Sequence, residues 1–163
     1  MQRLGSNGRI TDIQCALGIS QLKRIDKFKK RRQEIVISYN RAFKELEERG
    51  LVILPPWPDD TDPCYHLYPF RLTSRAPLTR DELFVKLRKE GIYAQVHYIP
   101  IYRHPYYSRQ GFRSDDYPET EAYFSGCISL PLFPALSYNE LQYVVHTVFN
   151  LLKNPGINDK GAL

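Results

Sequence analysis

The sequence predicts an α+β fold, in which long N-terminal helices are followed by a small, mainly antiparallel sheet packed with helices. Three observations favour this class. Apolar residues recur at helical spacing over residues 11–49, short strand-like runs follow only after a proline-rich loop, and later segments open with helix-capping residues. Because the strand-like runs do not alternate regularly with long helices, a doubly wound parallel sheet is not favoured.

The first predicted helical segment begins after Thr11, a good N-cap, and runs to about Arg49, where Gly50 supplies a stop. Its length exceeds that of a typical globular helix, so we expect a break near Asp26 that gives two helices. The first of these is rich in small and apolar residues, such as those at 15–19. This composition suits burial against another subunit or domain.

Three short segments have the character of β-strands. Residues 65–72 alternate and are rich in aromatic side chains, and Pro69 within them favours an edge or a bulge. The run that precedes them, residues 55–60, holds three prolines and is expected to form a loop. Residues 92–101 predict a second strand, and residues 127–130 predict a short third one.

Two helices are predicted between these strands. Thr79 caps the first, and Glu82, three residues later, completes a capping box. Gly91 ends this helix. A second, shorter helix is expected over residues 118–125, after Pro118.

A last helix is predicted over residues 138–152, with Ser137 as its cap and Glu140 in the capping-box position. At this length a single domain is the natural expectation. We therefore assign residues 1–153 to one domain, which includes the first helix, and residues 154–163 to a flexible tail.

The chain carries a net charge of +5, and much of the excess lies between Lys23 and Arg32. Such a surplus suits a nucleic acid, an anionic nucleotide-sugar or simply solubility. The basic run falls on a predicted helix with an apolar stripe, so the cations can occupy its solvated face. A basic binding module remains one alternative, although no aromatic-rich RNA-binding signature accompanies the run.

The sequence gives no sign of a membrane span, a disulfide framework or a metal site. No apolar run approaches the roughly 20 residues that a transmembrane helix needs, and the N-terminus lacks a signal-peptide pattern, so we expect a cytoplasmic protein. Cys15, Cys64 and Cys127 are far apart and odd in number, and the histidines show no helical pairing. No metal is expected.

A Gly-rich turn with Asn7 and Arg9 leads into Thr11 and an apolar helix, an arrangement that favours a phosphate group. Residues 4–22 (LGSNGRITDIQCALGISQL) closely resemble the G-x-N-x-R-x-T-D-x-Q-A-A-L-G-x-x-Q-L stretch of sugar aminotransferases of the DegT/StrS type, which use pyridoxal phosphate. Ser6 and Gly8 depart from the aromatic residues that this family often has there.

Three later blocks extend the resemblance in the same order. Residues 65–72 resemble the family's H-L-Y-P-I-R strand, and residues 96–107 resemble its H-Y-x-P-x-x-x-x-P-Y loop. Residues 117–123 and 128–134 resemble its P-x-A-E-x-Y and S-L-P-L-F-P blocks. The resemblance covers about residues 4–150 and is confined to the C-terminal part of the family.

The resemblance implies the small C-terminal domain of a fold-type I homodimeric enzyme. Such an enzyme transfers an amino group, with glutamate the expected donor, to a nucleotide-linked keto-sugar in amino-sugar or polysaccharide biosynthesis. In the family, the lysine that forms the Schiff base belongs to the large N-terminal domain. None of the lysines here lies in a Gly-rich setting that suits this role. We therefore assign no catalytic residue to this chain and expect it to be inactive alone.

The resemblance also implies binding roles. Asn7 would reach the cofactor phosphate of the neighbouring subunit, and Arg9 would meet the diphosphate of the substrate. His97, Tyr98 and Tyr106 would orient the sugar nucleotide. The plainer alternatives are an ordinary surface turn for Asn7 and Arg9 and a packed aromatic loop for the other three.

Several other residues are given structural roles or none. His66 and Tyr68 alternate along a predicted strand and are expected to be structural, as is His146 on the last helix. Besides the basic module, a regulatory relative that has lost transamination fits the sequence as well, because the deciding lysine is not in view.

Overall fold

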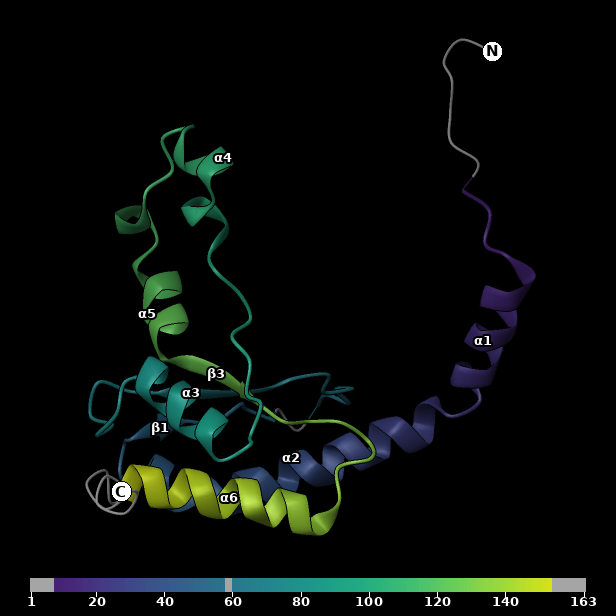
Figure 1. The fold of residues 1–163 in the computed structure, drawn as a ribbon, viewed down its shortest axis with the longest axis horizontal. Helices are drawn as coiled ribbons and strands as arrows, with labels where there is room; N and C mark the ends of the chain where they lie inside the picture. The colour runs from purple at the N-terminus through teal and green to yellow at the C-terminus, as the bar shows by residue number, and fades with distance from the viewer. Residues whose placement is uncertain (1–7, 58–59, 154–163) are drawn as a thin grey trace.

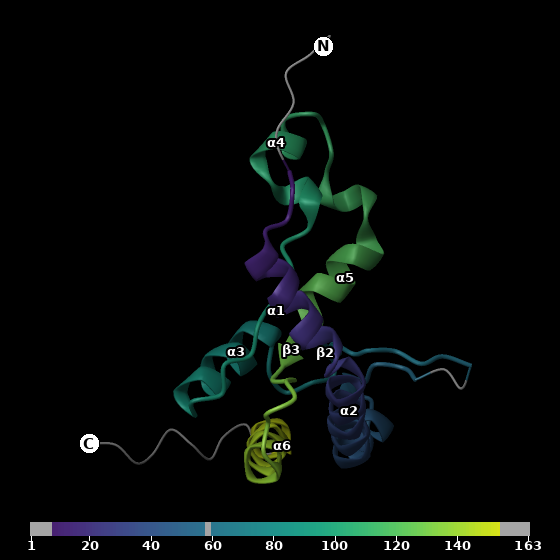
Figure 2. The same ribbon diagram turned by 90° about the vertical axis from the view of Figure 1, so that its right-hand side faces the viewer.

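The computed structural model describes residues 8–57 and 60–153. A three-stranded sheet forms the centre, and helices α2, α6 and α3 cover one of its faces (Figure 1). From the opposite face rises a segment of residues 98–117, here called the arm (Figure 2). This arrangement confirms the α+β class and the order of long helices before a small sheet.

The N-terminal helical segment is divided in two, as expected. Helix α1 spans Asp12–Leu22, and α2 spans Ile25–Glu48. Thr11 caps α1, with Gln14 as the partner in its capping box. Gly50 follows α2 with a φ of +70°, a conformation that glycine adopts without steric cost.

Helix α1 projects away from the rest of the chain and has no buried residue (Figure 1). Its apolar side chains are open to solvent, and Ile13 is 76% exposed. The burial expected from its composition is therefore not provided within this chain.

The sheet consists of β1 (Val52–Ile53), β2 (Tyr68–Leu72) and β3 (Cys127–Leu130) in the order β1-β2-β3, with both pairs antiparallel. The expectation that Pro69 marks an edge strand is wrong, because β2 is central. The proline is tolerated because β1 pairs only with Arg71 and Leu72 of β2. β1 therefore does not extend alongside Pro69, and the N–H group that proline lacks is not needed for pairing with β1.

The predicted strand over residues 92–101 is also wrong for most of its length. Ile92 and Ala94 are buried, as the alternation indicated, but only Gln95 pairs with β3, exchanging two backbone hydrogen bonds with Ser129. Pro100 then supplies no donor, and the chain enters a 3₁₀ helix, η1, at Ile101–Arg103. The alternation of apolar residues therefore indicated which side chains are buried, and it did not indicate continued strand pairing.

The capping residues predicted the remaining long helices. Helix α3 (Arg80–Lys89) begins after Thr79, whose side chain and that of Glu82 form the expected capping box. Helix α6 (Tyr138–Lys153) begins after Ser137, and the hydroxyl of Ser137 donates to Glu140.

The shorter elements lie in and beside the arm. After η1 the arm contains α4 (Pro105–Ser108) and a second 3₁₀ helix, η2 (Ser114–Asp116). Helix α5 (Pro118–Gly126), which was predicted, then leads directly into β3. The residues assigned to a tail, 154–163, lie outside the described residues.

The core fills the space between the sheet and helices α2 and α6. Four aromatic rings dominate it, with centroid separations of 5.7 Å for Tyr39 and Phe43, 4.7 Å for Tyr39 and Tyr68, and 5.0 Å for Phe43 and Phe70. Both buried phenols are hydrogen-bonded: Tyr39 donates to the carbonyl oxygen of Pro131 and Tyr68 to Oδ1 of Asn40. Burial raises the pKa of both hydroxyls.

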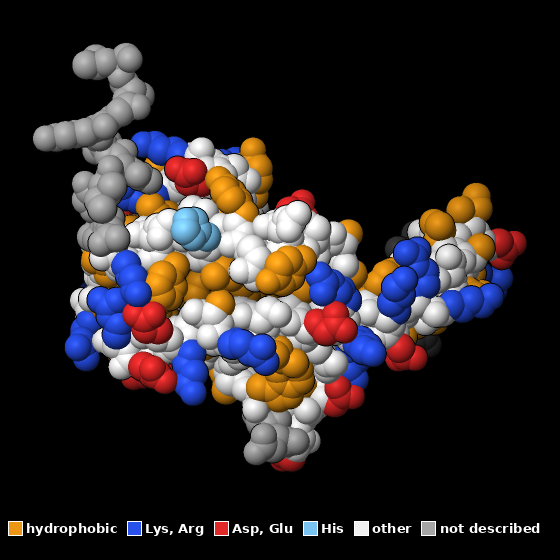
Figure 3. All heavy atoms as spheres, turned by 90° about the horizontal axis from the view of Figure 1, so that it is seen from below, with side chains coloured by type: hydrophobic (Ala, Val, Ile, Leu, Met, Phe, Trp, Pro, Cys, Tyr) orange, Lys and Arg blue, Asp and Glu red, His pale blue; other side chains and the backbone are white. Residues whose placement is uncertain are grey.

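The outer faces of α2 and α6 carry charges of both signs (Figure 3). Within the basic run, Lys29 is paired with Asp62, and Arg31 is paired with Glu34. These pairings favour the interpretation of the run as a solvated helix face. No helix in the described part of the chain is long and apolar enough to cross a bilayer.

Candidate functional site

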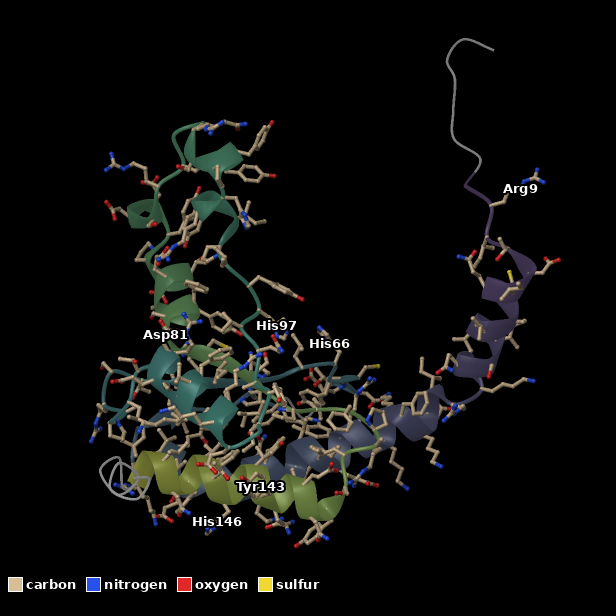
Figure 4. All side chains as sticks on the ribbon, viewed as in Figure 1. Arg9, His66, Asp81, His97, Tyr143 and His146 are labelled. Carbon is tan, nitrogen blue, oxygen red and sulfur yellow. The ribbon has the colours of Figure 1, made fainter. Side chains whose placement is uncertain are left out.

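A surface hollow of about 420 Å³ lies on the face of the sheet that the helices leave open. The chain segments around β2 and β3 contribute to it, with His66 on one side and His97 on the other (Figure 4). Hydroxyl groups in the lining come from Tyr65, from Tyr123 of α5 and from Ser129 of β3. The hollow therefore gathers two imidazoles and three hydroxyls from four separate segments.

His97 is fixed within this hollow by a hydrogen bond. Its Nδ1 lies 2.9 Å from Oγ of Ser129, a residue that is only 6% exposed. The ring of Tyr98 meets the imidazole edge-on, at a centroid separation of 4.8 Å, and is itself 76% exposed. The structure thus places two of the predicted substrate contacts side by side.

Tyr106 lies elsewhere. It sits on α4 at the tip of the arm, is 69% exposed, and its ring contacts Tyr107 (Figure 1). The described chain therefore does not bring Tyr106 together with His97.

A cluster around Glu121 braces the base of the arm. The carboxylate accepts hydrogen bonds from the Tyr102 hydroxyl at 2.9 Å and from Nε of Arg103 at 2.9 Å, and Nη2 of Arg103 pairs with its other oxygen. The ring of Tyr102 stacks on Tyr117 with 4.6 Å between centroids, so both sides of the arm are joined. The hydrogen bonds from Arg103 contribute most to the lowering of the pKa of Glu121.

Replacing Glu121 with glutamine is expected to loosen the arm, because Arg103 loses its charged partner. Hydrogen exchange of the backbone amides of residues 101–117 measures the effect, and Glu119→Gln, an exposed glutamate on the same helix, is the control. A carboxyl group whose pKa is lower in the folded than in the unfolded chain stabilises the fold at pH values above its unfolded pKa. This stabilisation is lost as the pH falls through the folded pKa. Acid is therefore expected to reduce protection in the unmodified chain; equal protection in both variants and at low pH would rule out the brace.

Arg9 is exposed and lies just before α1, far from His97 of the same chain (Figure 4). Asn7 lies outside the described residues. Arg9 therefore does not join the hollow within one chain.

Three features of the hollow were not predicted. His66, interpreted from the sequence as structural, is exposed and lines the hollow, whereas Tyr68 is buried as expected. Ser129 was passed over, although a polar residue within an apolar strand was a signal available in the sequence. Tyr123 was also missed; burial, together with its hydrogen bond to Cys127, raises the pKa of its hydroxyl to about 12.

The lysines do not fit a covalent cofactor site. A lysine that acts as a nucleophile near neutral pH is activated by a desolvated setting or a neighbouring cation. Each lysine in the described ranges is exposed or half-buried. Half-buried Lys29 is bonded to Asp62, and this hydrogen bond raises its pKa, which keeps the amine protonated. Within the described residues, no group of histidine, cysteine and acidic side chains is arranged to hold a metal.

The chain is similar in sequence to proteins of a known family. The sequence model of the DegT/DnrJ/EryC1/StrS aminotransferase family matches residues 1–149. The chain is 39% identical over 145 residues to the spore coat polysaccharide biosynthesis protein SpsC of Bacillus subtilis, covering 87% of the chain and 36% of that protein. It is 32% identical over 154 residues to a UDP-4-amino-4,6-dideoxy-N-acetyl-β-L-altrosamine transaminase of Helicobacter pylori, covering 94% and 40%.

A solved structure is also similar to this chain over most of its length. The sugar aminotransferase Spr1654 of Streptococcus pneumoniae, in its PLP form, superposes with a TM-score of 0.81 at 29% identity, over 91% of this chain and 37% of that one. The same protein has also been solved in a PMP form. The chain thus spans less than half the length of the relatives that it matches.

Proposed function

Because the chain belongs to the DegT/DnrJ/EryC1/StrS aminotransferase family, we propose that residues 1–153 form the C-terminal small domain of a pyridoxal-phosphate-dependent sugar aminotransferase. The complete enzyme transfers an amino group from glutamate to a nucleotide-linked keto-sugar. The observation that carries this proposal is the meeting of His97 and Ser129, from two separate motif blocks, in one hollow on the open face of the sheet.

The cofactor is supported by the relative Spr1654, which has been solved in PLP and PMP forms. When bound, pyridoxal phosphate supplies the electron sink that amino transfer requires. The lysines of the described residues, which are exposed or half-buried, do not suit its covalent attachment, so we assign that lysine to another part of the complete enzyme. Asn7 contributes an amide donor to the cofactor phosphate.

The remaining site residues recognise the substrate. The guanidinium of Arg9 pairs with the diphosphate, a geometry that suits its planar array of donors. His97 contacts the sugar from the hollow, Tyr98 contacts it from the start of the arm beside His97, and Tyr106 approaches from the tip of the arm. The nucleotide-sugar class is supported by the transaminase of Helicobacter pylori, whose name specifies a UDP-linked sugar.

The complete enzyme is a homodimer whose active sites are shared. Helix α1 carries exposed apolar side chains and extends away from the sheet, which suits packing against a second subunit. Because Arg9 lies far from His97 of its own chain, Arg9 and Asn7 serve the hollow of the partner subunit.

Removing Arg9 or His97 tests these roles in the complete enzyme. Arg9→Ala is expected to lose charge-assisted contacts worth about 1.5–3 kcal/mol, which corresponds to a fall of roughly 10- to 150-fold in kcat/KM for the nucleotide-sugar. His97→Ala is expected to lose a neutral hydrogen bond worth about 0.5–1.5 kcal/mol, a fall of roughly 2- to 13-fold. The kinetics toward glutamate in its own half-reaction are expected to change little. His146→Ala, on an exposed position of α6, is the matched control. Unchanged kinetics toward the sugar in both variants would contradict the assignment.

A further inference from the structure

The hydroxyl of Ser129 has a single hydrogen-bond partner among the described residues, Nδ1 of His97. A hydroxyl both donates and accepts, and a neutral imidazole carries its proton on only one nitrogen. If Nδ1 carried the proton, the hydrogen of this buried hydroxyl would be left without an acceptor, which costs free energy. The arrangement that satisfies both groups has Ser129 donating to Nδ1.

The backbone of Ser129 is unusually well fixed. It lies in β3 opposite Pro69 of β2, and on its other side it exchanges backbone hydrogen bonds with Gln95 at 3.0 and 2.7 Å. Gln95 in turn lies two residues before His97. The same pairing therefore anchors both the hydroxyl and the segment that carries the imidazole.

We propose that Ser129 is the positioning residue for His97: its hydroxyl holds Nδ1, so that neutral His97 carries its proton on Nε2, available to donate to an oxygen of the substrate. Ser129 itself touches no substrate. The proposal rests on the role of His97 in the proposed function, and it adds the residue, the tautomer and the direction of the hydrogen bond.

The alternative is that Ser129 only fills space in the sheet. Its neighbours in β3 pack in the core, and a buried serine can be replaced by alanine at little cost when its partner is also removed. The two interpretations differ in the enzyme that retains His97, where a space-filling serine can be removed without loss of kcat/KM and a positioning serine cannot. A positioning residue acts through His97, so its removal has no further effect once the imidazole is gone.

A double-mutant cycle in the complete enzyme separates them. Ser129→Ala is expected to lower kcat/KM for the nucleotide-sugar about 10-fold, because it leaves Nδ1 of His97 without its hydrogen-bond partner. In the His97→Ala background the same change is expected to have no effect, and Ser129→Thr, which keeps the hydroxyl, is expected to restore most of the loss. Ser125→Ala, an exposed serine on α5, is the control.

Nuclear magnetic resonance of the His97 ring nitrogens in the 163-residue chain tests the hydrogen bond between Ser129 and His97 and needs no activity assay. Near neutral pH we expect a protonated Nε2 and an unprotonated, hydrogen-bonded Nδ1, whose resonance shifts in Ser129→Ala and not in Ser125→Ala. Unchanged ring resonances in Ser129→Ala, or additive losses in the cycle, would overturn the proposal. If the resonances behave as expected but His97→Ala keeps full activity, the pair stands and the proposed role of His97 fails.

Discussion

Replacing Phe43 with alanine is expected to lower the free energy of unfolding by about 3–5 kcal/mol, the range found when a buried phenylalanine is truncated in a core. Phe43 is fully buried on α2 and lies between the rings of Tyr39 and Phe70. Removing it takes away one of the ring contacts between α2 and β2, and the cavity cannot collapse without moving one of these two elements.

Denaturant unfolding measures this effect as a shift of the midpoint at constant slope. Phe112→Ala is the matched control, because Phe112 lies in the arm and is 44% exposed; a change of less than about 0.5 kcal/mol is expected there. Similar losses in the two variants would show that the core between sheet and helices is not where the stability lies.

The second large effect concerns activity. This chain alone is expected to show no transamination of a nucleotide-linked keto-sugar with glutamate and pyridoxal phosphate. The cofactor can react reversibly with exposed lysines, but none in the described part of the chain is desolvated, so the adduct is not held. After dialysis we expect no cofactor absorbance above that of a denatured sample.

The complete enzyme is the positive control in this experiment and is expected to retain cofactor and turn over. If the chain by itself kept stoichiometric cofactor and consumed glutamate, the assignment of the attachment lysine to another part of the enzyme would be wrong.

The local signals of the sequence predicted the helices well, because capping depends on neighbouring residues. Thr79 with Glu82 and Ser137 with Glu140 each mark a helix that the structure contains. The break between α1 and α2 was also predicted, although it comes slightly earlier than Asp26. These features require no knowledge of distant contacts.

Strand pairing was harder to predict because it depends on which segments meet. The alternation after Gly91 reported the burial of Ile92 and Ala94, but it could not show that only Gln95 finds a partner in β3. For the same reason the central place of β2 was missed.

The arrangement of the candidate site residues in space could be predicted only in part. His97 and Tyr98 are adjacent in the sequence and remain together in the structure, whereas Tyr106 is carried away by the arm. Ser129 could not be linked to His97 from the sequence, since 32 residues separate them and only the fold of β3 brings them together.

Reducing the complete enzyme with borohydride and mapping the modified peptide tests the central claim most directly. Reduction makes the bond between pyridoxal phosphate and its lysine permanent, so mass spectrometry identifies that residue. The account predicts a label on a lysine outside these 163 residues. A label on a lysine of this chain, or no labelled lysine in an enzyme that turns over, would contradict it.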